Sequence, residues 1–367
     1  MIRKIAAARF AFGVLTFGLV AGGLFAAAPA FAASDVSNSG AVANQAVTAV
    51  AAPIASAQTA SLISGAIGGA ISGGIGGGFT GGGTGGGFSP SGGATPGPIS
   101  MNGRDSGRAA GSADKKFGTW MQGSYASVEN SQAGLQMDGN VYNVVGGLDY
   151  KLSDRALIGV SLGYENLDLT TTFNNGSTKS DGLSIIPYFG FQLNNTWSIS
   201  ASGGYGMLNY DVVRNTNVRG SYDAERWFVS GNLNGAYGFG RWRLMPTVGV
   251  MYLEEKSDAY TESTGGLVGS STTKLGRVTF GGNVGYAFEK VMPYVKLVGE
   301  YDFEKNAPVA LGNGTFSNDD ELGAQIGLGI NFFGLGSFSG NVEGAYLSAG
   351  RQDLDVWSVS ARLRATF

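Results

Sequence analysis

Apolar and polar residues alternate through most of the C-terminal two-thirds of the chain. From Trp357 to Phe367 every second residue is apolar, and every residue between them is polar. The same period of two recurs at 156–169, 291–303 and 321–333. A period of two places successive side chains on opposite faces of a β-strand. The pattern therefore predicts a series of strands, each with one apolar and one polar face.

Two environments could produce such strands: a soluble sandwich with an apolar core, or a membrane barrel with an apolar outer face. The expected strands are about ten to fifteen residues long, where soluble strands centre on about five or six. Gly, Ser and Asn dominate the polar face, and aromatic residues such as Trp197, Trp242 and Tyr252 fall near strand ends. Long strands with aromatic ends are typical of transmembrane barrels, and we favour that interpretation.

The spacing of the alternating segments predicts an all-β fold, a twelve-stranded antiparallel transmembrane barrel over residues 113–367. The expected strands are 116–128, 140–151, 156–169, 181–193, 197–210, 222–238, 242–253, 276–288, 291–303, 321–333, 337–348 and 353–367. Connections of two or three residues alternate with longer ones near 129–139, 170–180, 211–221, 254–275 and 304–320. Short periplasmic turns and longer outer loops are expected of such barrels.

The first residues have the features of an export signal. Arg3 and Lys4 precede a short apolar stretch, and the small residues Ala30-Phe31-Ala32 follow it. This order predicts a signal peptide over residues 1–32, cleaved between Ala32 and Ala33. A single transmembrane anchor is the alternative, but the stretch is short for the ~20 residues that a spanning helix needs.

Between the signal and the barrel the sequence is uncharged from Val36 to Gly103. Residues 33–64 contain an Ala-rich stretch that predicts a helical segment, which Pro53 is expected to kink or interrupt. Residues 65–112 are Gly-rich and are expected to form a flexible linker. The alternative is a helix with Gly65, Gly69, Gly73 and Gly77 on one smooth face. We also expect the helical segment to enter the barrel lumen.

Composition excludes most catalytic chemistry. The chain has no Cys and no His, so no Ser-His-Asp triad, thiolate nucleophile, disulfide or His- or Cys-ligated metal site can form. The net charge is −3 and only 14% of residues are charged, which gives no basic face for nucleic acid. We therefore expect a non-enzymatic protein with no cofactor, no metal and no nucleic-acid partner.

The arrangement of signal, coreless segment and barrel resembles the bacterial autotransporters of type V secretion, with an unusually short passenger. The resemblance rests on the opening strand Phe117–Gly123, Gly-Tyr pairs such as Gly163-Tyr164, and the closing strand to Phe367. It implies a monomeric outer-membrane barrel in contact with lipid, made with the export translocon and the barrel-assembly machinery. It also implies that Phe367, together with Trp357, forms the barrel-assembly signal.

Charged residues at alternate strand positions are expected to line the lumen. The candidates are Arg243, Lys296, Glu300, Asp302, Glu343, Arg362 and Arg364. Ordinary polar lining with mutual ion pairs is the favoured interpretation. A lumenal acid that cleaves a threaded helix is the alternative, although no Asn-Asn pair occurs between Ala33 and Ser112.

Three functions are consistent with these features. The barrel could anchor or translocate its own short N-terminal segment, it could be a passive porin-like channel, or it could be a surface adhesin acting through its outer loops. We expect the first. The sequence alone leaves open whether the segment is secreted, cleaved or retained in the pore.

Overall fold

A computed structural model describes residues 40–74, 97–98, 116–311, 316–335 and 338–367. The chain divides into two units, Met1–Ala32 and Ala33–Phe367, and all described residues belong to the second. The expected signal peptide, its cleavage site at Ala32 and Ala33, and most of the Gly-rich segment lie outside the described residues.

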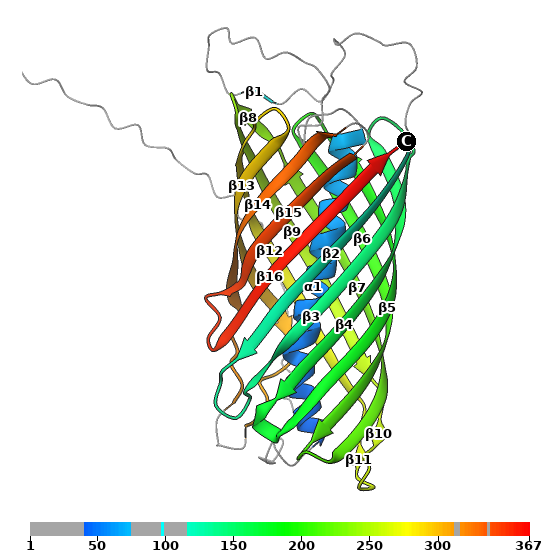
Figure 1. Cartoon of the computed structure of the whole chain (residues 1–367), viewed down its shortest axis with the longest axis vertical. Coiled ribbons are helices and arrows are strands. Elements are labelled where there is room, and N and C mark those ends of the chain that lie inside the picture. The colour runs from blue at the N-terminus through cyan, green and yellow to red at the C-terminus, as the bar shows by residue number, and fades with distance from the viewer. Residues whose placement is uncertain (1–39, 75–96, 99–115, 312–315, 336–337) are drawn as a thin grey trace, which may run out of the picture. The chain divides into compact units, whose positions relative to one another are not determined.

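Twelve long antiparallel strands among the described residues form a closed barrel, as the alternation predicts (Figure 1). Each strand pairs with the next along the chain, and β16 closes the ring by pairing with β2. The barrel strands are β2 (Phe117–Asn130), β3 (Met137–Lys151), β4 (Ala156–Thr171), β5 (Gly176–Gln192), β6 (Trp197–Arg214), β7 (Val218–Gly235), β9 (Trp242–Ser257), β12 (Ser271–Tyr286), β13 (Val291–Lys305), β14 (Leu322–Leu335), β15 (Phe338–Ala349) and β16 (Leu354–Thr366).

Four short strands and one helical turn accompany the ring. β8 (Tyr237–Phe239) extends β7 along β9, and β1 (Gly97–Pro98) pairs with β8. β10 (Tyr260–Thr261) and β11 (Leu267–Val268) form a hairpin in the connection between β9 and β12. The 3-10 turn η1 (Thr172–Asn174) joins β4 to β5.

The apolar side chains of each strand lie on the outer surface of the barrel, and the alternate, polar side chains face the lumen. On β13, Val295, Leu297 and Tyr301 are exposed, whereas Glu300 and Asp302 are buried. On β16, Trp357, Val359 and Leu363 are exposed in the same way. An exposed apolar belt around a closed sheet is what lipid contact requires, so the inside and outside of each strand follow the sequence pattern.

A charge on this belt should destabilise the protein far more than a charge inside. Leu328 is 65% exposed near the middle of β14, and we expect Leu328→Arg to cost ~2–4 kcal/mol because the guanidinium would face hydrocarbon. Gln325→Arg on the same strand is the matched control, because Gln325 bonds Glu300 inside the lumen. Reversible unfolding in lipid vesicles measures both. Equal destabilisation would contradict the assignment of faces.

Two of the expected long connections are wrong. The segments near 170–180 and 211–221 are mostly strand, because β4 runs to Thr171, β5 starts at Gly176, β6 runs to Arg214 and β7 starts at Val218. Their sequences are polar because these strand ends extend beyond the apolar belt. Asp168 and Lys179, for example, pair across β4 and β5 at the exposed surface. The connection near 129–139 shortens to 131–136, and 258–270 and 306–321 remain as connections of eleven residues or more.

One helix, α1 (Gly40–Gly74), runs through the barrel (Figure 1). Its first residues lie at the end that carries β10 and β11, and its last residues lie toward the end that carries the C-terminus. At ~1.5 Å per residue its 35 residues extend for about 52 Å, more than a ~30 Å hydrocarbon core.

The helix confirms the expectation of a lumenal helical segment but corrects its limits. α1 continues through Pro53 and ends at Gly74, not near Ser64, so a flexible linker starting at residue 65 is wrong. Glycine costs about 1 kcal/mol per residue in a helix. Ile63, Ala66 and Ile67 are nevertheless buried against the wall, and this packing offsets the cost of the glycines. Helix propensity, read from the sequence, includes the cost but not the packing.

Candidate functional site

The lumen with its helix is the candidate functional site. We call the half of α1 nearer β10 and β11 the outer half and the other the inner half; the outer half packs against the wall through small apolar residues. Ala46, Val47, Ala51 and Ala55 belong to one buried cluster with wall residues from β2, β3, β4, β6 and β7. The same cluster includes Tyr260 and Val268 of the β10–β11 hairpin, called the outer hairpin below, and Val309 and Leu311 of the 306–321 connection. Side chains no larger than Val at these positions let the helix fit between the walls.

The inner half of α1 packs through Ile63, Ala66 and Ile67, which are at most 1% exposed. They contact a second cluster whose wall residues include Trp120, Val145, Leu157, Ile186, Tyr188 and Phe228. Burial of an Ile side chain stabilises by roughly 1.5–3 kcal/mol. Between Ala46 and Ile67 the helix is therefore held by apolar packing as well as by the hydrogen bonds described next.

Three hydrogen bonds join α1 to different parts of the barrel. Asn143 Nδ2 of β3 donates to Gln58 Oε1 at 2.7 Å, and Thr273 Oγ1 of β12 donates to Thr48 Oγ1 at 3.2 Å. Asn44 Nδ2 donates to the Tyr260 hydroxyl at 2.7 Å. Because the partners lie on β3, β10 and β12, these bonds fix both the depth and the rotation of the helix.

The outer hairpin holds the first turn of α1. The Tyr260 ring stacks on Tyr222, with ring centroids 5.1 Å apart, and burial raises the pKa of Tyr260 above its ordinary value. Glu262 is held by Arg214 Nε at 2.7 Å and lies beside Gly40, the first residue of α1. A carboxylate at this position is favourable because the N-terminus is the positive end of the helix dipole.

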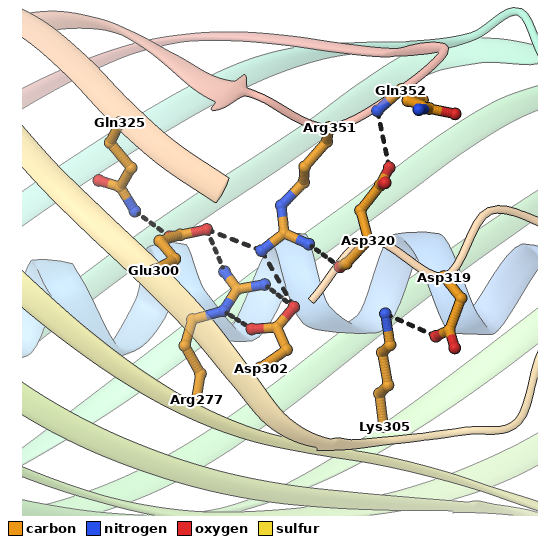
Figure 2. A network of polar contacts seen from close by, with 9 residues as sticks. All are labelled: Arg277, Glu300, Asp302, Lys305, Asp319, Asp320, Gln325, Arg351 and Gln352. Carbon is orange, nitrogen blue, oxygen red and sulfur yellow. Dashed lines mark hydrogen bonds and ion pairs between the residues drawn. The ribbon is translucent and has the colours of Figure 1, made fainter. Parts of the chain in front are cut away.

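A buried cluster of ion pairs lies in the lumen wall beside α1 (Figure 2). Arg277 of β12 bonds Asp302 at 2.5 Å and Glu300 at 3.0 Å, both on β13. Arg351 contacts the same two carboxylates at 3.0 and 3.1 Å from the β15–β16 connection. Gln325 Nε2 donates to the remaining Glu300 oxygen at 2.7 Å. Two cations and two anions are thus neutralised inside one network.

Four further ion pairs lie in the described wall beside the helix. Arg226 bonds Glu255 and Glu165, which lie on β9 and β4. Arg364 of β16 bonds Asp149 of β3 at 2.6 and 2.8 Å. The Glu343 carboxylate accepts from Lys296 Nζ at 2.9 Å and from the Tyr294 hydroxyl at 2.6 Å.

The structure places the sequence candidates in three different settings. Glu300 and Asp302 meet in the cluster of Figure 2, Lys296 meets Glu343, and Arg364 meets Asp149. Arg362 faces a cavity. Arg243 lies at the end of β9, where its side chain donates to the Gly240 and Trp242 carbonyls and joins none of the described lumenal clusters.

Sequence reasoning missed several partners. Arg277 and Arg226 stand at inward positions of expected strands, so the alternation could have found them. Arg351 lies in the short connection between β15 and β16, where no alternation operates. Its role depends on how the connection folds over the barrel mouth.

A cavity of about 300 Å³ separates the inner half of α1 from the opposite wall. Ser64, Gly65 and Gly68 of the helix line one side. Residues of β7, β9 and β12–β16 line the other, most of them amides, hydroxyls and charged groups. A smaller cavity of about 170 Å³ lies along the outer half of α1 beside the ion-pair cluster. The helix is therefore off-centre and leaves polar space on one side.

No group of acidic residues suited to a metal ion occurs in the described part of the chain. Within the same residues, no helix has the length and hydrophobicity that a membrane span requires.

The closed sheet, its apolar belt and its polar lumen define the class of outer-membrane β-barrel proteins. The model of the autotransporter β-domain family matches residues 119–345. The translocator domain of the autotransporter NalP from Neisseria meningitidis is similar in fold, with a TM-score of 0.58 at 15% identity over 70% of this chain and 90% of that domain. The β-domain of the Bordetella autotransporter BrkA gives a TM-score of 0.54 at 19% identity, over 69% of this chain and 100% of that domain.

The chain therefore belongs to the autotransporter family, and it is an outer-membrane protein. Among curated proteins, YaiT of Escherichia coli strain K12 is 23% identical over 265 residues. That alignment covers 68% of this chain but 27% of YaiT, so the chain spans about a quarter of this relative.

The C-terminal residue offers a test of the assembly signal. Phe367 is 61% exposed on the outer face, and its backbone exchanges hydrogen bonds with Phe117 at 3.1 and 3.3 Å where β16 meets β2. We expect Phe367→Asp to reduce the folded barrel in the outer-membrane fraction, because a charge replaces the aromatic ring at the closing seam. Phe367→Tyr, which keeps the ring, is the control. A normal amount of folded, heat-modifiable barrel in the Phe367→Asp variant would contradict the role of Phe367 as an assembly signal.

Proposed function

We propose that this barrel anchors its own N-terminal segment and delivers it to the cell surface, with α1 retained in the lumen as the connecting stalk. The proposal includes removal of the signal peptide after Ala32 and assembly by the barrel-assembly machinery. No catalytic step is part of it.

The direction of α1 carries the proposal. Its first residue, Gly40, lies beside Glu262 in the outer hairpin, whereas Ile63 and Ile67 pack near Leu157, at the start of β4. The connections 258–270 and 306–321 fall at the first of these ends, and longer connections are typical of the outer side. The N-terminus of α1 at Gly40 therefore faces the outer end of the barrel, which supports the proposal.

The composition of α1 supports passage through the lumen. Its 35 residues include no charge, and its side chains are mostly those of Ala, Gly, Ser, Thr and Val. When such a segment moves along the lumen, it carries no charge that would be buried without a partner. The helix is then held by many weak contacts, which suits a segment that stops after export.

A passive channel and a loop-based adhesin are the competing functions. The two apolar clusters that join α1 to the wall argue against an open pore as the resting state. The outer hairpin presents Leu267, which is 86% exposed, but the hairpin also contacts the start of α1. Its contacts favour a role in holding the helix over a role in adhesion.

Protease accessibility of an epitope tag on intact cells tests the proposal. A tag inserted after Ala33 is expected to be cleaved by external protease. A tag at Gly265 in the outer hairpin should be cleaved as well, and a tag after Asp154, between β3 and β4, should be protected. Protection of the N-terminal tag in cells whose Gly265 tag is cleaved would contradict surface delivery.

A further inference from the structure

Arg362, which is half-buried, differs from four other arginines of the lumen. Arg226, Arg277, Arg351 and Arg364 each have a carboxylate oxygen within 3.1 Å. The Arg362 side chain has no hydrogen-bond or ion-pair partner among the described residues, although it lines a cavity in the same lumen. A guanidinium inside a protein normally has an anionic partner, because leaving the charge unpaired is costly.

The neighbours of Arg362 explain why no side chain neutralises it. Across the sheet it pairs with Asn341 of β15 and Gln122 of β2, which are both uncharged. On the helix side it lies against Gly65, where an added Cβ would come within 2.6 Å of Nη1. The whole of α1 lacks a carboxylate.

The acidic residues around the same cavity are already engaged. Both Glu343 oxygens accept hydrogen bonds, one from Lys296 and one from Tyr294. Glu300 is bonded by Arg277, Arg351 and Gln325. After these pairings the cavity lining retains one uncompensated positive charge, that of Arg362.

The guanidinium faces the cavity of about 300 Å³, which lies at the low end of the size of small-molecule sites. Asn283, Asn331, Ser360 and Thr279 contribute further polar groups to its lining. The lining also reaches Asn234 and Gly235, where β7 ends at the short-turn side of the barrel. The cavity therefore extends toward the end of the barrel that carries the short turns.

We propose that this cavity binds a small oxyanion, a carboxylate or a phosphate, with Arg362 as the residue that contacts it. The planar fork of a guanidinium matches two oxygens of either group, and charge-assisted hydrogen bonds are the stronger kind. Amide and hydroxyl groups around the cavity supply additional hydrogen bonds. The bound anion replaces the missing carboxylate partner of Arg362.

Isothermal titration of the full-length barrel in detergent micelles tests this site, with inorganic phosphate and acetate as separate probes at constant ionic strength. We expect one ion to bind per barrel. Arg362→Gln should weaken binding about tenfold or more, the value of one charge-assisted hydrogen bond. Arg362→Lys should weaken it less, because the charge remains and only the fork is lost. Arg155→Gln is the matched control, because Arg155 is exposed in the turn between β3 and β4.

The unfolding temperature provides a second readout that also shows whether the variant folds. Without added anion, Arg362→Gln should be at least as stable as the natural chain, because it removes a half-buried charge that has no ion-pair partner. Added phosphate or acetate should raise the unfolding temperature of the natural chain and of Arg155→Gln more than that of Arg362→Gln. Binding of phosphate alone would identify a phosphate site, and binding of acetate alone a carboxylate site. Absence of binding by either probe, or equal binding by Arg362→Gln, would overturn the proposal.

Discussion

Removal of residues 40–74 is expected to raise the single-channel conductance of the barrel by about tenfold, because a helix ~10 Å wide leaves the lumen. With α1 in place, its apolar contacts with the wall fill part of the lumen, and cavities of about 300 and 170 Å³ lie beside the helix. The deletion leaves all twelve barrel strands intact, so the folded barrel should persist. Planar-bilayer recordings of the full chain and the deletion, each folded in detergent, measure the difference.

Point variants on α1 show whether conductance rises because the helix leaves the lumen, while the segment itself stays in the chain. Ile63 is fully buried among Trp120, Val145 and Leu157, so Ile63→Asp should expel the helix and raise conductance toward that of the deletion. Ser64→Asp is the matched control, because Ser64 lines the polar cavity and a carboxylate there can be solvated. Equal, low conductance of the deletion and the full chain would show that α1 does not close the pore.

The fold was predictable because the alternation has a physical cause at every strand. A lipid-facing side chain must be apolar along the whole depth of the bilayer, so the signal in β13, β14 and β16 survives without any knowledge of neighbouring strands. The wrong predictions near 170–180 and 211–221 arise where the strands extend beyond the lipid. Beyond the lipid both faces tolerate polar residues, and strand and loop then look alike in sequence.

The helix was only partly predictable. The Ala-rich composition indicates helix near residues 41–64, but the glycines after Ser64 indicate flexibility when propensity alone is counted. Their place in α1 depends on contacts with Trp120, Ile186 and Phe228, which lie far away in the sequence. Such tertiary packing cannot be read from the local composition of the segment.

The pairing of charged residues depends on strand register. The alternation of apolar and polar positions places five charged residues on the inner face, but it does not say which of them form pairs. They are Glu300, Asp302, Glu343, Arg362 and Arg364. Arg364 bonds Asp149 two strands away, whereas Arg362, on the same strand and face, has no acidic partner among the described residues. The stagger of neighbouring strands and the position of α1 decide this outcome, and neither has a sequence signature.

The second large effect concerns the ion-pair cluster of Figure 2. Glu300 is 1% exposed and contacts both Arg277 and Arg351, so Glu300→Ala should destabilise the barrel by about 3–5 kcal/mol. The variant leaves two buried guanidinium groups to share Asp302 alone. Glu300→Gln keeps the shape of the side chain and tests whether the loss comes from charge.

An exposed ion pair on the same barrel is the matched control. Lys179 and Asp168 are 2.8 Å apart with side chains 58% and 49% exposed, so Asp168→Ala should cost only ~0–1 kcal/mol. Reversible urea unfolding in lipid vesicles gives both free energies on one scale. A loss at Glu300 as small as the loss at Asp168 would mean that water reaches the cluster through the neighbouring cavities and that these charges do not depend on one another for neutralisation. A loss several times larger, reproduced by Glu300→Gln, would establish the cluster as the electrostatic support of the wall beside α1.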